Sequence, residues 1–113
     1  MNNQSSETPI APKLSDPGLF RQAMLIDGEW VQADSGATLE VRNPATGELV
    51  GRVPNGGGVE TKRAVEAADR ALKQWRAALP KERSAVLRNL FNLMHQHIDD
   101  LALILTCEQG KTL

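Results

Sequence analysis

The chain has 113 residues, of which 41% are hydrophobic and 24% are charged, so its length fits about one domain of a globular protein. These fractions exclude a collagen, a coiled coil and a wholly disordered chain. The 13 basic and 14 acidic side chains give a net charge of −1, so we expect neither nucleic acid nor a membrane as a partner. Only 4% of the residues are aromatic, which is few for a chain that builds its own core.

Residues 1–13 are polar, include two prolines, and lack both the basic and the apolar region of a secretory signal. We therefore predict a disordered tail over 1–13. The single cysteine, Cys107, cannot form an intramolecular disulfide, which favours a reducing compartment. Together these features predict a cytoplasmic protein.

Residues 14–55 are predicted to form a short helix followed by an antiparallel strand unit. Asp16 is placed to cap the short helix and Pro17 to begin it. Apolar alternation predicts four strands, at residues 24–26, 29–31, 39–42 and 48–53. Asp27-Gly28 is a strong signal for a tight hairpin turn between the first two strands. Residues 43–47 (NPATG) form the turn between the last two.

Residues 56–113 are predicted to form two long amphipathic helices. Over residues 59–78, apolar side chains recur at three- and four-residue spacing, which places on one face Val65, Ala68, Leu72 and Trp75. Pro80 opens the second helix, whose apolar positions are Leu87, Leu90, Phe91, Met94, Ile98, Leu101 and Leu105. We expect Asp99 or Asp100 to restart this helix at a bend and Gly110 to end it.

Two glycine-containing segments resemble parts of nucleotide-binding loops without completing them. Gly110-Lys111-Thr112 matches the end of a phosphate-binding loop, but Leu105 stands where the pattern requires glycine, and the segment follows a helix instead of a strand. Gly56-Gly57-Gly58 precedes a helix, but the glycines are contiguous and do not form the dinucleotide fingerprint. We predict a strand-to-helix connector there.

The remaining candidates for chemistry have structural explanations. Cys107 is followed by Glu108, whose charge disfavours the thiolate that a nucleophile requires. His95 and His97 lie two positions apart on a helix and therefore face different directions, so they cannot bind one metal together. The arginines of the two helices are interspersed with acidic residues, which predicts a salt-bridged surface or an interface with another part of a larger protein; they are Arg63, Arg70, Arg76, Arg83 and Arg88.

Several segments, taken in order, resemble the opening of the NAD(P)-dependent aldehyde dehydrogenase superfamily. They are residues 26–31 (IDGEWV), 41–51 (VRNPATGELVG), 64–68 (AVEAA), 71–76 (ALKQWR), 82–88 (ERSAVLR) and 108–111 (EQGK). Residues 19–30 and 104–113 resemble the succinate-semialdehyde dehydrogenase branch in particular. The chain departs from that branch at Thr112, where proline is usual, and at Val59, where an acidic residue often begins the helix.

The resemblance implies an α+β fragment, the N-terminal part of a fold that is α/β and Rossmann-like in the full enzyme. Residues 56–113 would pack on the domain that binds NAD or NADP, and the catalytic cysteine and glutamate would lie in segments that this chain does not match. We therefore assign no catalytic, cofactor-binding or metal-binding residue and expect no cofactor to bind this chain. Some members bind a monovalent cation near the position of Glu108 and the carbonyls of Val41 and Arg42, a site that we do not assign here.

For the full enzyme, the resemblance implies oxidation of succinate semialdehyde to succinate in 4-aminobutyrate breakdown. Its partners would be the rest of its own polypeptide and further copies in a dimer or tetramer. The alternative is an autonomous helical interaction module that binds a partner through residues 90–105. That alternative leaves the strand segments before Gly56 unexplained.

Overall fold

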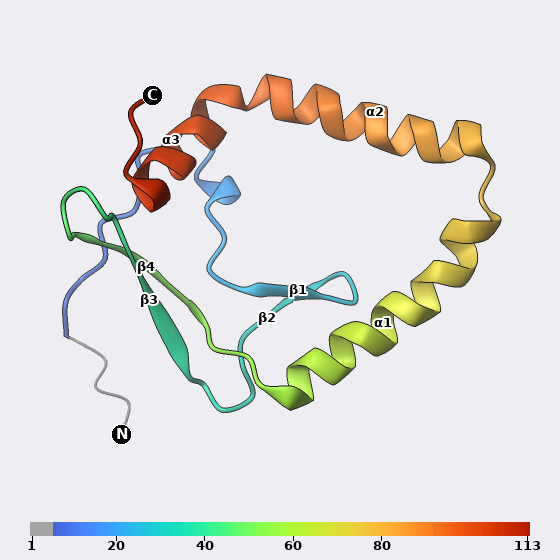
Figure 1. Ribbon diagram of the computed structural model, residues 1–113, viewed down its shortest axis with the longest axis horizontal. Coiled ribbons are helices and arrows are strands. Elements are labelled where there is room, and N and C mark those ends of the chain that lie inside the picture. The colour runs from blue at the N-terminus through green and yellow to red at the C-terminus, as the bar shows by residue number, and fades with distance from the viewer. Residues whose placement is uncertain (1–5) are drawn as a thin grey trace.

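The computed structural model describes residues 6–113, which form an open frame of two strand pairs and three long helices (Figure 1). In chain order the elements are η1 (Pro17–Leu19), β1 (Met24–Ile26), β2 (Glu29–Val31), β3 (Thr38–Arg42), β4 (Leu49–Pro54), α1 (Gly58–Ala77), α2 (Pro80–Gln96) and α3 (Ile98–Gln109). The radius of gyration is 17.1 Å, against about 13 Å for a compact domain of this length. The frame is therefore far more extended than a domain packed around one core.

Two antiparallel pairs make up the strand half, and their turns follow from local chemistry. In the first pair, β1 and β2 meet with Leu25 opposite Trp30. Asp27 and Gly28 form the tight turn between them with φ values of 54° and 77°, a backbone conformation that these two residues tolerate well. The second pair, β3 and β4, has a bulge between Val41 and Arg42. Both predicted hairpins are confirmed.

The helical half has three helices because the second predicted helix divides in two. His97 ends α2 and precedes α3, and its φ of −110° and ψ of 23° interrupt the helical geometry. The predicted bend is confirmed, but α3 begins at Ile98, and its N-cap, His97, makes no side-chain cap hydrogen bond. Asp99 and Asp100 lie inside the first turn of α3 instead of capping it.

Gly110 ends α3 as predicted, in the left-handed conformation with φ of 69°. Its backbone N donates to the Thr106 carbonyl oxygen at 2.8 Å. A Cβ at this position would lie 2.9 Å from Cγ of Pro44 and 3.2 Å from the backbone N of Ala45. Gly110 therefore combines a helix stop with close packing against the turn between β3 and β4.

The core of the described residues is small and lies at the strand ribbon. The buried hydrophobic residues are Ala33, Leu49 and Val50, and Leu49 is only 1% exposed. Gly51, which follows on β4, is also buried, and a Cβ there would lie 3.3 Å from the Phe20 ring. The three helices add no fully buried hydrophobic side chain to this core.

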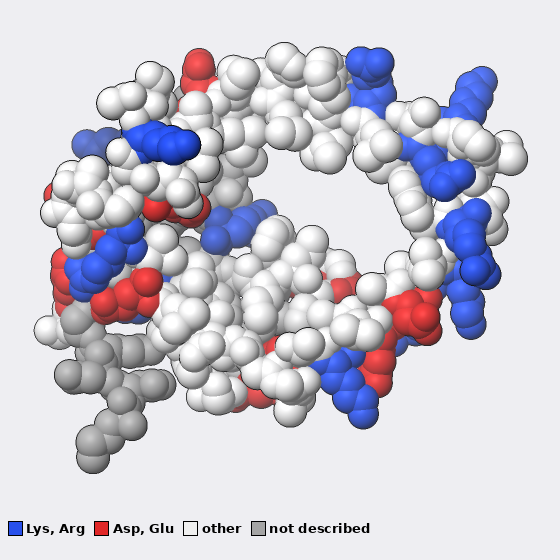
Figure 2. Space-filling model, in the orientation of Figure 1, with Lys and Arg blue, Asp and Glu red and all other residues white. Residues whose placement is uncertain are grey.

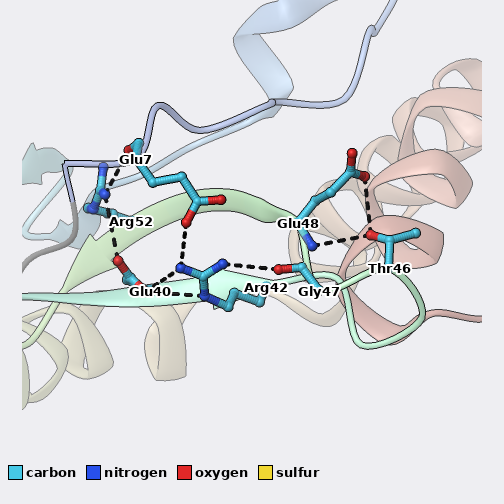
Figure 3. A network of polar contacts seen from close by, with 7 residues as sticks. All are labelled: Glu7, Glu40, Arg42, Thr46, Gly47, Glu48 and Arg52. Atoms are coloured by element: carbon cyan, nitrogen blue, oxygen red, sulfur yellow. Dashed lines mark hydrogen bonds and ion pairs between the residues drawn. The ribbon is translucent and has the colours of Figure 1, made fainter.

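The N-terminal segment lies along the strand ribbon. Residues 1–5 of the predicted tail lie outside the described residues, whereas from residue 6 onward the segment makes contacts. Ile10 N donates to the Leu49 carbonyl oxygen at 2.8 Å. In Figure 3 the Arg42 guanidinium reaches both Glu7 and Glu40, at 2.7 Å and 2.9 Å, and Arg52 reaches the backbone oxygen of Glu7.

Truncating the central side chain of this small core should loosen the strand ribbon. We expect Leu49→Ala to cost about 2–5 kcal/mol, because it leaves a cavity in the only tightly packed part of the frame. The matched control is Leu39→Ala on the neighbouring strand, where the side chain is 52% exposed. Amide hydrogen exchange along β3 and β4 measures this loss of stability. We expect faster exchange in Leu49→Ala and not in Leu39→Ala. Equal exchange rates in the two variants would show that Leu49 is not the centre of the core.

Candidate functional site

The structure does not bring the candidate cysteine and histidines together. Cys107 is half-buried on α3, and the His95 ring contacts the Phe91 ring at a tilt of 54°, with 4.4 Å between the centroids. His97 occupies the junction of α2 and α3. Among residues 6–113, no group of three or more His, Cys, Asp or Glu side chains is placed to hold a metal ion.

The glycine-rich start of α1 is occupied by a carboxylate of the same helix. Gly57 is the N-cap, and its backbone N donates to Oε2 of Glu60 at 2.8 Å. The other oxygen of Glu60 accepts from the backbone N of Asp34 at 2.6 Å. These donations hold the pKa of Glu60 below its usual range. An anionic ligand would meet this negative charge at the helix end, so the residues 56–58 do not suit a phosphate.

A second buried carboxylate fastens α3 to the N-terminal segment. Asp100, 7% exposed, accepts from the backbone N of Asp16 at 2.9 Å and from that of Ser15 at 2.8 Å. These two donations lower the pKa of Asp100. The side chain of Asp16 in turn accepts from Gly18 N and caps η1, as predicted. Asp100 thus joins α3 to two residues that lie 85 and 84 positions earlier in the sequence.

We call these two arrangements the carboxylate clamps: Glu60 with Asp34 and Gly57, and Asp100 with Ser15 and Asp16. Neither clamp was predicted from the sequence. The spacing of Glu60 three residues after Gly57 is a capping-box signal and could have indicated half of the first clamp. Its bond to Asp34, and both bonds of Asp100, join distant segments through backbone donors. No residue type in the sequence marks such donors.

The most extensive functional feature is the apolar side of the two longest helices. The predicted periodicity is confirmed, but about half of the surface of each side chain on it stays exposed: the exposed fractions lie between 42% and 62%. This apolar face consists of Val65, Leu72 and Trp75 on α1, of Leu87, Leu90, Phe91 and Met94 on α2, and of Ile98 at the start of α3. In Figure 1, α2 spans the frame away from both strand pairs, and the centre of the frame stays open in the space-filling view of Figure 2.

The apolar face is large enough for its burial to affect the stability of the protein strongly. Burying one such side chain fully stabilises a protein by about 1.5–3 kcal/mol. A whole domain has a net stability of only about 5–15 kcal/mol, so leaving the face in water forgoes stabilisation as large as that of a domain. Exposed apolar surface of this extent is typical of an interface. None of the described helices is long and apolar enough to cross a membrane.

Comparison with known proteins gives this face a context. The model of the aldehyde dehydrogenase family matches residues 30–113. Over 101 residues the chain is 57% identical to a glutarate-semialdehyde dehydrogenase of Pseudomonas putida and 54% identical to the NADP⁺-dependent succinate-semialdehyde dehydrogenase of Escherichia coli. In both cases the match covers 89% of this chain and 21% of the relative. The chain therefore spans about a fifth of the length of these curated relatives.

Solved structures agree with the sequence matches. An E. coli NADP-dependent enzyme superposes with a TM-score of 0.86 at 55% identity, over 88% of this chain and 21% of that one. The succinate-semialdehyde dehydrogenase of Burkholderia pseudomallei superposes with a TM-score of 0.81 at 53% identity, over 83% and 20%. The open frame is thus an arrangement that occurs within these larger proteins, where it corresponds to their N-terminal part.

The Asp100 clamp predicts a specific pH response. Because the folded-state pKa lies below the ordinary value of 3.8, the unfolded chain takes up this proton first as the pH falls. The stabilisation by Asp100 is therefore complete above the ordinary pKa and is lost as the pH falls through the lower folded value. In NMR spectra, we expect the Ser15 and Asp16 amide protons to stay downfield until the pH is below 3.8.

Two variants make this titration specific. Asp100→Asn keeps one oxygen acceptor, so at neutral pH at least one of the two amide protons should move upfield. Asp99→Asn removes a neighbouring carboxylate in the same helical turn and should leave both resonances and their titration unchanged. Amide resonances that titrate at or above the ordinary aspartate pKa would contradict the clamp.

Proposed function

The chain belongs to the aldehyde dehydrogenase family, and we propose that it forms the N-terminal portion of an enzyme that oxidises a semialdehyde of a short dicarboxylic acid. The proposed substrate is succinate semialdehyde, the product is succinate, and the pathway is 4-aminobutyrate breakdown. The activities of two relatives support the substrate class, since one is a glutarate-semialdehyde dehydrogenase and the other a succinate-semialdehyde dehydrogenase. The proposed cofactor of the whole enzyme is NAD or NADP, and the proposed assembly is a homo-oligomer in the cytoplasm.

Within that enzyme, the proposed role of this chain is to support the domain that binds the cofactor. The observation that carries the proposal is the exposed apolar face on a chain that spans a fifth of its relatives. We assign residues 14–55 to the strand unit and residues 56–113 to the part that packs on the cofactor domain. Burial of the face against that domain would supply the core that the described residues lack.

The described residues do not fit a nicotinamide cofactor. A dinucleotide pyrophosphate needs free backbone amides at a glycine-rich helix start. At the start of α1, Gly57 N is taken by the Glu60 carboxylate, whose negative charge opposes a phosphate. We therefore derive no catalytic step through this chain, and its proposed contribution to the reaction is to position the parts that perform it.

A chimera tests the proposal with a known enzyme. The matched residues of the E. coli succinate-semialdehyde dehydrogenase would be replaced by the corresponding residues of this chain, at 54% identity. We expect a soluble chimera that oxidises succinate semialdehyde with NADP⁺, because the helices should pack on the rest of that enzyme as its own do. A chimera that does not fold, or that folds without this activity, would contradict the proposed role.

A matched pair of charge insertions locates the contact in the same chimera. Leu90→Asp places a carboxylate on the apolar face, whereas Asn89→Asp adds the same charge at the preceding position. Burying an unpaired charge costs several kcal/mol, so Leu90→Asp should abolish soluble, active enzyme and Asn89→Asp should not. Equal behaviour of the two variants would show that the face stays in water.

A further inference from the structure

Basic side chains gather where α1 ends and α2 begins. We call this group the basic corner; its members are Lys73, Arg76, Lys81, Arg83 and Arg88. Glu82 is the one acidic residue between positions 73 and 88. Figure 2 shows the blue side chains clustered around the turn between these helices, at the right of the frame. The corner therefore carries a local charge of about +4 within a chain whose net charge is −1.

The basic corner differs from the other arginines of the frame. Arg63 pairs with Asp34 at 2.9 Å, and Arg70 pairs with Asp27 at 3.1 Å. The prediction of a salt-bridged surface is confirmed for these two arginines. Among residues 6–113, by contrast, no ion pair involves a member of the basic corner. Glu82 lies close in sequence, but its carboxylate accepts from Leu79 N at 2.7 Å and caps α2.

Arg83 has one buried donor without an acceptor among residues 6–113. It is half-buried, and its Nε atom has no access to solvent and no hydrogen-bond partner within the described part of the chain. A buried N–H group without an acceptor is unfavourable, and native structures leave few of them. The planar guanidinium suits a carboxylate that accepts two parallel hydrogen bonds.

We propose that the basic corner docks an acidic segment of the enzyme's own polypeptide, from the part that this chain does not span. This inference rests on the proposed function and adds the chemistry of one contact to it. The corner is continuous with exposed apolar side chains on the same turn, since Leu79 is 63%, Val86 54% and Leu87 60% exposed. A segment that covers these apolar side chains would therefore also contact the basic side chains of the corner.

The match to a fifth of each relative favours the enzyme's own polypeptide over a second copy as the occupant. In the proposed enzyme, the apolar face packs on the remaining four-fifths of the length, so a segment of that part lies against the side chains that adjoin the basic corner. Arginines of the frame hold four of its carboxylates, but within residues 6–113 Glu29, Glu66 and Asp69 take part in no ion pair. A second copy is therefore the competing occupant, and cross-linking separates the two.

Zero-length cross-linking of the chimera tests the proposal directly. A carbodiimide joins a lysine amine to a carboxylate in contact with it, and peptide mass spectrometry identifies both residues. We expect cross-links from Lys73 or Lys81 to Asp or Glu in the E. coli part of the same subunit. Cross-links that join two subunits, that stay within the chain, or that do not form at these lysines would overturn the proposal.

Two sets of variants separate the contact from general effects of charge. The corner set is Lys81→Gln, Arg83→Gln and Arg88→Gln, and the control set removes the same charge at Lys13→Gln, Lys62→Gln and Lys111→Gln. We expect only the corner set to lower the temperature of half-inactivation, and 1 M NaCl, which screens ion pairs strongly, to reduce the difference between the sets. Equal temperatures would overturn the inference, whereas an unfolded or inactive parent chimera would instead overturn the proposed function.

A single-residue comparison then assigns the role of Arg83. Arg83→Lys keeps the charge but loses the two parallel donors, so its inactivation temperature should fall between those of Arg83→Gln and the parent. If Arg83→Gln matches the parent, Arg83 makes no contact with an acidic segment.

Discussion

The exposure of the apolar face on α1 and α2 is the constraint that dominates the structure. Two short strand pairs cannot cover helices of this length, and the side chains that the strands do bury are few: Ala33, Leu49 and Val50. The face is regular, since its side chains recur with helical periodicity, and it is largely exposed in the frame. In proteins, a helix gains most of its stability when its apolar face packs against other residues, and little from helix propensity alone. This exposure supports the proposal that the frame packs on the rest of a larger enzyme.

The two carboxylate clamps fix where the helices join the rest of the frame. Glu60 fastens the start of α1 to the loop after β2, and Asp100 fastens α3 to the segment before η1. Each uses charge-assisted hydrogen bonds to backbone N–H groups, which are stronger than neutral ones. In Figure 1, α1 leaves the strand unit and α3 returns toward it, and α2 spans the distance between them.

Local features of this fold are predictable from the sequence, because their causes lie within a few residues. Asp27-Gly28 adopts the positive φ values that a tight hairpin requires, and Gly110 ends the last helix for the same stereochemical reason. The long-range bonds of the clamps were not predictable, because their donors are backbone groups far away in the sequence: those to Asp100 lie 84 and 85 positions away. The division at His97 was placed only approximately, because Asp100, a good capping residue by type, is used for a distant contact instead.

The candidate site shows the same limit. Periodicity identified the apolar side chains of α1 and α2 but could not say whether they meet each other, the strands or something else. The shortage of aromatic residues pointed toward a missing core. The open frame and its match to a fifth of larger enzymes explain that shortage, because a chain that packs on the rest of an enzyme does not have to build a whole core itself.

Calorimetry of the isolated chain, with its oligomeric state followed by sedimentation, tests most directly whether the apolar face depends on the rest of an enzyme. An autonomous domain of this size unfolds cooperatively with an enthalpy of about 0.7 kcal/mol per residue near 60 °C. We predict that the isolated chain shows no such transition as a monomer and instead aggregates or unfolds gradually. A sharp, reversible transition of the monomer with that enthalpy would contradict the account and favour an autonomous helical module.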